Sequence, residues 1–152
     1  MPPVALNPVR LLLVDDDSAQ LRLLARILEK NLPEHIHLEA LSDPTQALAR
    51  VETGGIDILV SDLVMSKVGG LELLNAIKDR NRCSQVLLMT AYSTADVLLQ
   101  AMEAGAVDYL LKPVAAEALV ELVLQSDQRL RRWREALAGT FKLSRRDRAQ
   151  VS

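Results

Sequence analysis

The amino-acid sequence predicts a doubly wound α/β fold with five parallel strands and five helices. Short apolar runs suited to buried strands alternate along the chain with segments whose apolar residues recur at helical spacing. Gly or Pro marks several of the connections between them. Because short crossovers between parallel strands are right-handed, this alternation gives one sheet with helices on both faces.

The first strand and helix are predicted in the amino-terminal segment. Residues 1–8 contain three prolines and are expected to be a loose lead-in. Arg10–Val14 is a short apolar run, and apolar residues then recur at helical spacing behind Asp17 or Ser18, either of which can cap a helix. The run is therefore predicted to be a strand that leads into a helix.

The second strand is predicted at His35–Leu41, where apolar and polar residues alternate. His35 and His37 fall on the polar side of this strand. Without a cysteine or carboxylate at metal-site spacing, they are expected to be solvated and not metal ligands. Ser42-Asp43-Pro44 has the composition of a helix start, so a second helix is predicted between it and Gly54-Gly55.

The remaining elements follow from the same signals. The central strand, Ile56–Asp62, is an apolar run that stops at an aspartate. After it the sequence predicts a loop at Leu63–Gly70, a helix from Leu71, a strand at Gln85–Thr90, a helix at about Thr94–Ala104, a strand at Asp108–Leu111 and a fifth helix from about Ala115.

Composition places the chain among ordinary globular proteins. With 152 residues, 49% of them apolar and 25% charged, it has enough chain for one domain with an aliphatic core. The net charge of −2 favours neither presence nor absence of a nucleic-acid partner. The single cysteine, Cys83, excludes an intrachain disulfide and a cysteine metal cluster. No apolar run reaches the ~20 residues of a membrane span and no signal peptide is evident, so a cytoplasmic protein is expected.

Polar residues gather at the ends of separate predicted strands. Asp15 and Asp16 follow the first strand, whereas Asp62, Thr90 and Lys112 end or follow three others. In a parallel sheet these ends share one edge, where ligands bind. Three carboxylates repel one another, so Lys112 and a Mg²⁺ ion are the expected neutralising groups. Such a set suits in-line transfer of a phosphoryl group to Asp62.

The stretches LLLVDDD, DILVSD, LLMTA and DYLLKP, in this order, resemble the receiver domain of two-component response regulators over about Val9–Ser126. The resemblance implies a flavodoxin-like strand order of 2-1-3-4-5. It also implies a phosphorylation-dependent switch that takes its phosphoryl group from a histidine kinase or phosphotransfer protein. Such a domain catalyses only its own phosphorylation and dephosphorylation, and it responds by changing the face formed by the fourth helix, fifth strand and fifth helix.

The resemblance assigns the acceptor and the metal ligands. Asp62 matches the phosphoacceptor. Asp15 and Asp16 match the acidic pair that holds Mg²⁺, with Asp16 as the direct ligand. Asp62 and the backbone carbonyl of Val64 complete the implied ligand set.

The resemblance also assigns the switch. Thr90 matches the hydroxyl that turns toward the phosphoryl group, and Lys112 matches the lysine that pairs with a phosphoryl oxygen. Tyr109 matches the aromatic residue that moves inward with Thr90, although simple packing at the strand edge would also place it there. The Lys112–Pro113 peptide bond is expected to be cis.

Two departures from the family pattern carry expectations. The loop after the acceptor contains no proline and has an added glycine, Met65–Gly70 being MSKVGG. It is expected to be looser, because Pro restricts the backbone and Gly frees it. Val64 and Tyr92 occupy the positions that tune dephosphorylation in this family. Neither is an acid or a carboxamide that would position water, so slow loss of phosphate is predicted.

The carboxyl-terminal segment is longer than a receiver domain needs. Residues 9–128 are assigned to the receiver domain and residues 129–152 to an extended helix with a basic tail. Apolar residues continue at nearly heptad spacing, which predicts a helix to about Ala138 and a homodimer seam at Leu130, Trp133 and Leu137. The alternative is a solvated linker.

Gly139 is expected to be a hinge after this helix. The tail carries four cations, which is weak support for nucleic-acid binding, so neither nucleic acid nor a membrane is predicted as a partner of this domain. A stand-alone receiver and the receiver part of a longer regulator are both compatible with the sequence, and the output is unknown.

Three rival functions are less well supported by the residues. A phosphatase with an aspartyl-phosphate intermediate would need an acid two residues after the nucleophile, where Val64 stands. A receiver fold without phosphorylation would not need the acceptor, metal, Thr and Lys positions filled. An FMN-binding protein would need a phosphate-binding loop after the first strand, where three aspartates would repel phosphate.

Overall fold

The computed structural model describes the backbone of residues 8–91 and 94–151 and the side chains up to Phe141, apart from the same gap. Strands and helices alternate throughout, as predicted. The strands are β1 (Val9–Val14), β2 (Ile36–Leu41), β3 (Ile58–Asp62), β4 (Gln85–Thr90) and β5 (Asp108–Leu111). The helices are α1 (Ser18–Asn31), α2 (Pro44–Glu52), α3 (Gly70–Arg80), α4 (Ala95–Glu103) and α5 (Ala116–Val151).

The five strands form one parallel sheet. Its order is β2-β1-β3-β4-β5, which confirms the predicted flavodoxin-like arrangement. Leu11 of β1 pairs with Ile58 of β3, and Val60 of β3 pairs with Leu87 of β4, so the central strands are in close register. Because all strands are parallel, their carboxyl ends share one edge of the sheet and their amino ends share the other.

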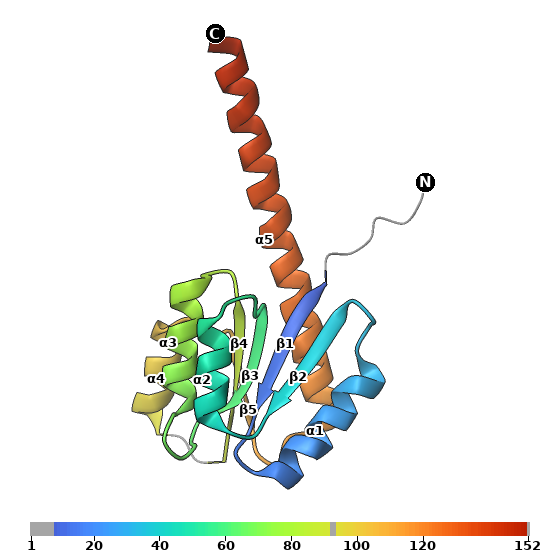
Figure 1. Cartoon of the computed structure of the whole chain (residues 1–152), viewed down its shortest axis with the longest axis vertical. Helices are drawn as coiled ribbons and strands as arrows, with labels where there is room; N and C mark the ends of the chain where they lie inside the picture. The colour runs from blue at the N-terminus through green and yellow to red at the C-terminus, as the bar shows by residue number, and fades with distance from the viewer. Residues whose placement is uncertain (1–7, 92–93, 152) are drawn as a thin grey trace.

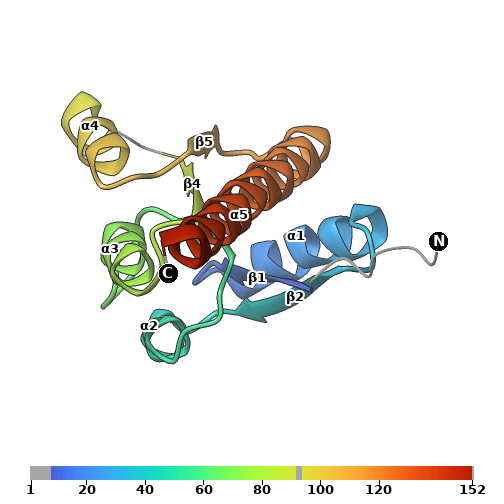
Figure 2. The same cartoon turned by 90° about the horizontal axis from the view of Figure 1, so that it is seen from above.

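Helices cover both faces of the sheet. Helices α1 and α5 lie on one face, and α2, α3 and α4 lie on the other (Figures 1 and 2). Each face has its own aliphatic core. The first core contains Leu13, Leu24, Leu28, Val60 and Leu119, and the second contains Leu12, Val51, Leu59, Leu74 and Leu88. Every residue of β3 and β4 is buried, because helices cover both faces of the sheet, and the middle of each strand is apolar.

Local sequence signals place most helix starts. Asp17 caps α1 by accepting hydrogen bonds from Ala19 N and Gln20 N, and Asp43 caps α2 by accepting one from Thr45 N. Thr94 caps α4 in the same way. The predicted starts are therefore confirmed to within one or two residues. The central strand begins at Ile58, two residues later than predicted, and Asp57 just before it accepts a hydrogen bond from Arg10 N.

Helix α5 is longer than predicted. It continues to Val151, past the expected end near Ala138. The prediction of a hinge at Gly139 is wrong in this structure, because Gly139 lies within the helix. An exposed glycine costs a helix only about 1 kcal/mol relative to alanine, and its neighbours Glu135, Ala136 and Leu137 favour the helix. Figure 1 shows α5 rising well past the edge of the sheet at which β1 begins.

The assignment of Leu130 to a dimer seam is wrong. Leu130 is 0% exposed and packs in the core between α5 and the sheet. The apolar series that includes Leu119 and Val123 therefore continues into this chain's own core for one more turn than expected. Trp133 and Leu137 are 55% and 44% exposed. These two remain available to a partner.

The expectation that His35 is solvated is also wrong. Its Nε2 lies 2.9 Å from Oδ2 of Asp127, whose side chain is 2% exposed. Asp127 lies on α5, so the residue before β2 is linked to a helix far away in sequence. His37 is exposed, as expected.

Candidate functional site

Three carboxylates meet at the carboxyl edge of the sheet. Asp15 and Asp16 directly follow β1, and Asp62 is the last residue of β3. An oxygen from each lies within 4.8 Å of the others. Asp15 and Asp62 are buried and Asp16 is exposed, so the cluster opens to solvent on one side. Carboxylate oxygens partly open to water are the donors that a hard divalent cation prefers, and this cluster could hold Mg²⁺.

Lys112 joins the cluster from the end of β5. Its Nζ donates to Asp62 Oδ2 at 2.8 Å, to Asp15 Oδ2 at 3.3 Å and to Gln20 Oε1 at 3.0 Å. Burial acts to lower the pKa of Lys112, but the hydrogen bonds and charges of Asp62 and Asp15 outweigh it, so the pKa lies above its usual value. Lys112 is therefore a fixed positive charge directly beside the Asp62 carboxylate.

Asp15 is the carboxylate least accessible to solvent. Its side chain is 0% exposed. Burial raises the pKa of this carboxyl above 3.8, although the Asp17 backbone hydrogen bond and Lys112 act in the opposite direction and Asp62 adds to the rise. The ionised form of Asp15 is thus costly for the fold, and a bound cation would relieve that cost.

Thr90 and Tyr109 line one cavity next to the site. It has a volume of about 510 Å³, and its walls also include Leu98 and Met102 of α4. Thr90 is buried at the end of β4, whereas Tyr109 is 48% exposed. The structure therefore places the two expected switch residues around a shared space, with Tyr109 pointing partly to solvent.

The loop after Asp62 packs closely against the end of β3 at Gly70. Gly70 approaches the backbone so closely that a Cβ there would lie 2.5 Å from the Asp62 carbonyl oxygen and 2.9 Å from Leu63 Cα. Val68 is buried, and Lys67 adopts a φ of 69°. Gly70 thus permits close packing at the end of the loop. At Gly69, which stands where the family pattern has an aspartate, a Cβ would make only an ordinary contact of 3.6 Å with the Leu63 carbonyl oxygen, so the expected loosening of the loop stays a prediction.

Other expected site features have defined positions. The Lys112–Pro113 peptide bond is cis, as predicted. Val64 N donates to Asp62 Oδ1 at 3.3 Å, and the Val64 side chain is 68% exposed beside the site. Ser66 N donates to Asp16 Oδ2 at 3.3 Å. Tyr92, expected to influence dephosphorylation, lies outside the described residues.

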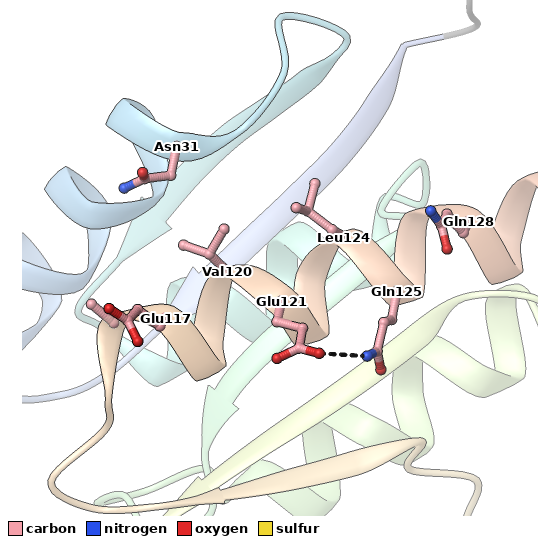
Figure 3. A pocket seen from close by; sticks show the side chains of 8 residues that line it. Asn31, Glu117, Val120, Glu121, Leu124, Gln125 and Gln128 are labelled. Carbon is pink, nitrogen blue, oxygen red and sulfur yellow. Dashed lines mark hydrogen bonds between the residues drawn. The ribbon is translucent and has the colours of Figure 1, made fainter.

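A groove between α1 and α5 contributes no comparable chemistry. It has a volume of about 490 Å³ and is lined by Asn31 and by α5 residues including Val120 and Leu124. Figure 3 shows the aliphatic side chains of α5 on the side of α1, and Gln125 bonded to Glu121 at 3.3 Å. With only scattered carboxylates and amides along its wall, the groove is a surface feature separate from the acidic cluster.

Some residues of the site and its surroundings were not predicted from the sequence. Gln20 accepts a hydrogen bond from Lys112. The only sequence signal for this contact was the position of Gln20 in the first turn of α1, just after the three aspartates. Asp57 and Asp127 are buried at the opposite edge of the sheet. An aspartate within the apolar run before β3 was a signal that could have been used, because a buried charge requires a partner.

Comparison with known proteins identifies the family. The family model for the response regulator receiver domain matches residues 11–124. This chain belongs to the response regulator receiver family.

Several relatives share the same region. The chain is 37% identical over 114 residues to the response regulator protein FleR of Pseudomonas aeruginosa, covering 75% of this chain and 24% of FleR. It is 34% identical over 111 residues to the transcriptional regulatory protein ZraR of Klebsiella oxytoca, covering 73% of this chain and 24% of ZraR. The chain therefore spans about a quarter of the length of these relatives.

Solved structures agree with the fold. A CheY-like response regulator receiver domain protein from Methanospirillum hungatei has a TM-score of 0.74 and 26% identity, covering 83% of this chain and 99% of that one. The signal receiver domain of an HD domain-containing protein from Pseudomonas fluorescens has a TM-score of 0.77 and 25% identity, covering 87% and 96%. Within the described residues, no helix has the length and apolarity to cross a membrane.

Proposed function

We propose that this chain is a signalling switch in which Asp62 accepts a phosphoryl group from phosphohistidine on a histidine kinase or phosphotransfer protein. An Asp62 carboxylate oxygen would attack phosphorus in line as the phosphorus–nitrogen bond breaks, and the histidine would leave. The observation that carries this proposal is the Lys112 Nζ, 2.8 Å from Asp62 Oδ2 within the three-carboxylate cluster. Family membership supports the same function.

The neighbouring residues have distinct roles in this proposal. Asp15, Asp16, Asp62 and the backbone carbonyl of Val64 would hold Mg²⁺, which supplies positive charge for the transferring oxygens. Lys112 supplies a second positive charge. The chain thus promotes its own phosphorylation and dephosphorylation and acts on no separate substrate.

The response is proposed to pass through Thr90 and Tyr109. Thr90 would turn toward the phosphoryl group, and Tyr109 would move into the cavity that both residues line. The exposed apolar residues of the nearby face, Leu99, Met102, Tyr109 and Leu111, would then be rearranged. Phosphate would shift a population between two existing arrangements of this face, formed by α4, β5 and α5.

A second copy of the chain is the proposed partner of the α5 extension, the part of the helix from Trp133 to Val151. Trp133, Leu137 and Phe141 are exposed on successive turns, with Phe141 67% exposed. Arg134 is the last residue of α5 to form an ion pair with the sheet in the described part of the chain. In proteins most of the stability of a helix comes from packing of its apolar face, and these three side chains are exposed. Pairing of two copies would cover the apolar side chains and stabilise the extension.

The output is proposed to lie outside the receiver residues. The relatives named above include a transcriptional regulatory protein in which the match covers about a quarter of the length. We propose that a separate output domain or partner protein acts downstream in the cytoplasm, and that the receiver itself contacts no nucleic acid or membrane.

The acceptor is tested by incubation with acetyl phosphate and Mg²⁺, followed by intact-mass spectrometry. The wild type should gain one phosphoryl group, and omission of Mg²⁺ should abolish the gain. Asp62→Asn should not be phosphorylated, whereas Asp79→Asn, which removes an exposed carboxylate from α3, should behave as the wild type. Equal phosphorylation of Asp62→Asn would refute the assignment.

The dimer is tested by light scattering with and without beryllofluoride plus Mg²⁺. A doubling of mass that Trp133→Glu and Leu137→Glu abolish would support pairing through α5. Glu135→Lys, on an exposed position of the same helix, is the matched control. A monomer under both conditions would refute the pairing and favour a receiver that binds another protein.

A further inference from the structure

Helix α5 is bonded to the amino edge of the sheet, opposite the acidic cluster. Figure 1 shows α5 crossing this edge before it leaves the domain. Over about two turns, two arginines of α5 bond to acceptors there, Arg129 and Arg134, while Arg131 bonds to Asp127 of the same helix. These contacts lie beyond the expected domain boundary at residue 128.

Asp57 is the centre of this edge. Its Oδ1 accepts from Arg134 Nη2 at 2.6 Å, and its Oδ2 accepts from Arg10 N at 2.9 Å. Its backbone N donates to the Arg10 carbonyl and its carbonyl accepts from Gln85 N, both at 2.9 Å. Asp57 is 8% exposed. One residue therefore connects β1, β3, β4 and α5, and charge-assisted hydrogen bonds are the stronger kind.

A second bond connects α5 with β4. Arg129 Nη1 donates to Gln85 Oε1 at 2.9 Å, and Gln85 is 3% exposed. Gln85 is the first residue of β4 and Thr90 is the last. Asp57 immediately precedes β3, which ends at Asp62. The two strands that carry the acceptor and the switch hydroxyl at one end are thus bonded to α5 at the other.

Buried contacts hold α5 in place between these bonds. Leu130 is fully buried, and Asp127 Oδ2 is 2.9 Å from both His35 Nε2 and Arg131 Nη2. Because of these contacts, α5 is expected to move together with the sheet edge and not to slide over it. A close-packed interior transmits such displacements.

From this geometry we propose that Arg129 and Arg134 are positioning residues that couple β3 and β4 to the α5 extension. This coupling rests on the proposed function of Asp62. Occupation of the acceptor site would displace β3 and β4, and the Asp57–Arg134 and Gln85–Arg129 bonds pass the displacement to α5. The surface formed by Trp133, Leu137 and Phe141 would therefore have a different position when the acceptor site is occupied than when it is empty, and a second copy would bind it differently.

The chain provides its own reporter for this coupling. Trp133 is the only tryptophan, and it is adjacent to Arg134. The experiment uses the full chain carrying Leu137→Glu, so that pairing of copies does not contribute to the signal. Trp133 emission and anisotropy are recorded as beryllofluoride and Mg²⁺ are added, and ¹⁹F NMR measures the bound beryllofluoride in the same samples.

Three substitutions are compared in that background. Arg134→Gln removes the charge bonded to Asp57, and Asp57→Asn keeps an acceptor for Arg10 N while weakening the bond to Arg134. Arg132→Gln is the matched control, because Arg132 is exposed and forms no ion pair within the described residues. The unsubstituted background and Arg132→Gln should show the same ligand-dependent change in Trp133 emission. Arg134→Gln and Asp57→Asn should bind beryllofluoride equally but lose at least half of that change.

Two results would overturn the coupling while leaving the acceptor assignment intact. One is bound beryllofluoride with no change at Trp133 in the unsubstituted background. The other is an undiminished change in both Arg134→Gln and Asp57→Asn. Failure of the unsubstituted background to bind beryllofluoride in the ¹⁹F spectrum is a different outcome, and it would overturn the acceptor assignment and the coupling together.

Discussion

Lys112 Nζ lies 2.8 Å from Asp62 Oδ2, although Asp62 ends β3 and Lys112 follows β5, two strands that are not neighbours in the sheet. Strand β4 separates β3 from β5, and the carboxyl edge brings the two side chains together. This ion pair partly neutralises the Asp62 carboxylate and places a positive charge where the proposed phosphoryl transfer would develop negative charge.

Replacement of Lys112 by methionine should slow phosphorylation by acetyl phosphate roughly a hundredfold, the usual cost of removing one group that stabilises developing charge. The substitution keeps the aliphatic length but leaves Asp15 and Asp62 without their shared cation. Stopped-flow or intact-mass kinetics give the rate. Lys30→Met, on an exposed position of α1, should react as the wild type. An unchanged rate in Lys112→Met would contradict the role of this ammonium.

Replacement of Asp15 by asparagine should stabilise the metal-free protein at neutral pH. Burial raises the pKa of Asp15 in the folded chain above 3.8, so the folded state holds this proton more tightly than the unfolded state does. The resulting stability is present below the unfolded pKa and is lost as pH rises through the folded pKa. Asp15→Asn does not ionise and avoids this loss.

Urea unfolding at several pH values checks this prediction. The advantage of Asp15→Asn should be largest at neutral pH and should disappear as pH falls toward 3.8. Asp16→Asn, at an exposed position of the same cluster, should gain less. A constant difference across the pH range would show that lost packing or hydrogen bonding, and not ionisation, governs the effect.

Val64 should slow the loss of phosphate from Asp62. Its side chain is 68% exposed beside the site and has no group that could orient an attacking water. Val64→Asn introduces a carboxamide there and should shorten the lifetime of the phosphorylated protein several-fold. Val64→Leu is the control, because it adds bulk without polarity. A wild-type half-life of seconds that Val64→Asn leaves unchanged would count against this explanation.

Gly70 should tolerate no side chain. A Cβ would lie 2.5 Å from the Asp62 carbonyl oxygen, so Gly70→Ala should cost about 2 kcal/mol of unfolding free energy and displace the acceptor. Gly139→Ala is the matched control, since nothing lies within 4 Å of its Cβ position on α5. That substitution should stabilise the helix by about 0.5–1 kcal/mol. Thermal unfolding compares the two, and equal effects would refute the steric argument.

Local pattern predicted the elements and the carboxyl edge well. Runs such as Gln85–Thr90 and Asp108–Leu111 have the same bounds in the structure as in the prediction. Caps such as Asp17 and Asp43 mark helix starts because their side chains bond locally. The clustering of Asp15, Asp62 and Lys112 follows from the parallel sheet alone. The helix caps depend only on residues close in sequence. The clustering depends on the parallel topology, which the alternation of predicted strands and helices indicates.

The errors concern contacts between distant residues. His35 binds Asp127 across 92 positions, and Arg134 binds Asp57 across 77. Heptad spacing at Leu130 did not reveal whether the helix faces its own sheet or another chain, because both surfaces require the same apolar residues. The length of α5 depended on whether Gly139 ends a helix, and propensity alone does not decide that.

Chemical mapping of the phosphorylated residue tests the central claim most directly. The wild type, phosphorylated by acetyl phosphate with Mg²⁺, is reduced with borohydride, which converts an aspartyl phosphate into homoserine, and its peptides are sequenced by mass spectrometry. Homoserine should appear at position 62 and at no other aspartate. Homoserine at Asp15 or Asp16, or phosphate retained elsewhere with Asp62 unmodified, would contradict the assignment of Asp62 as the acceptor.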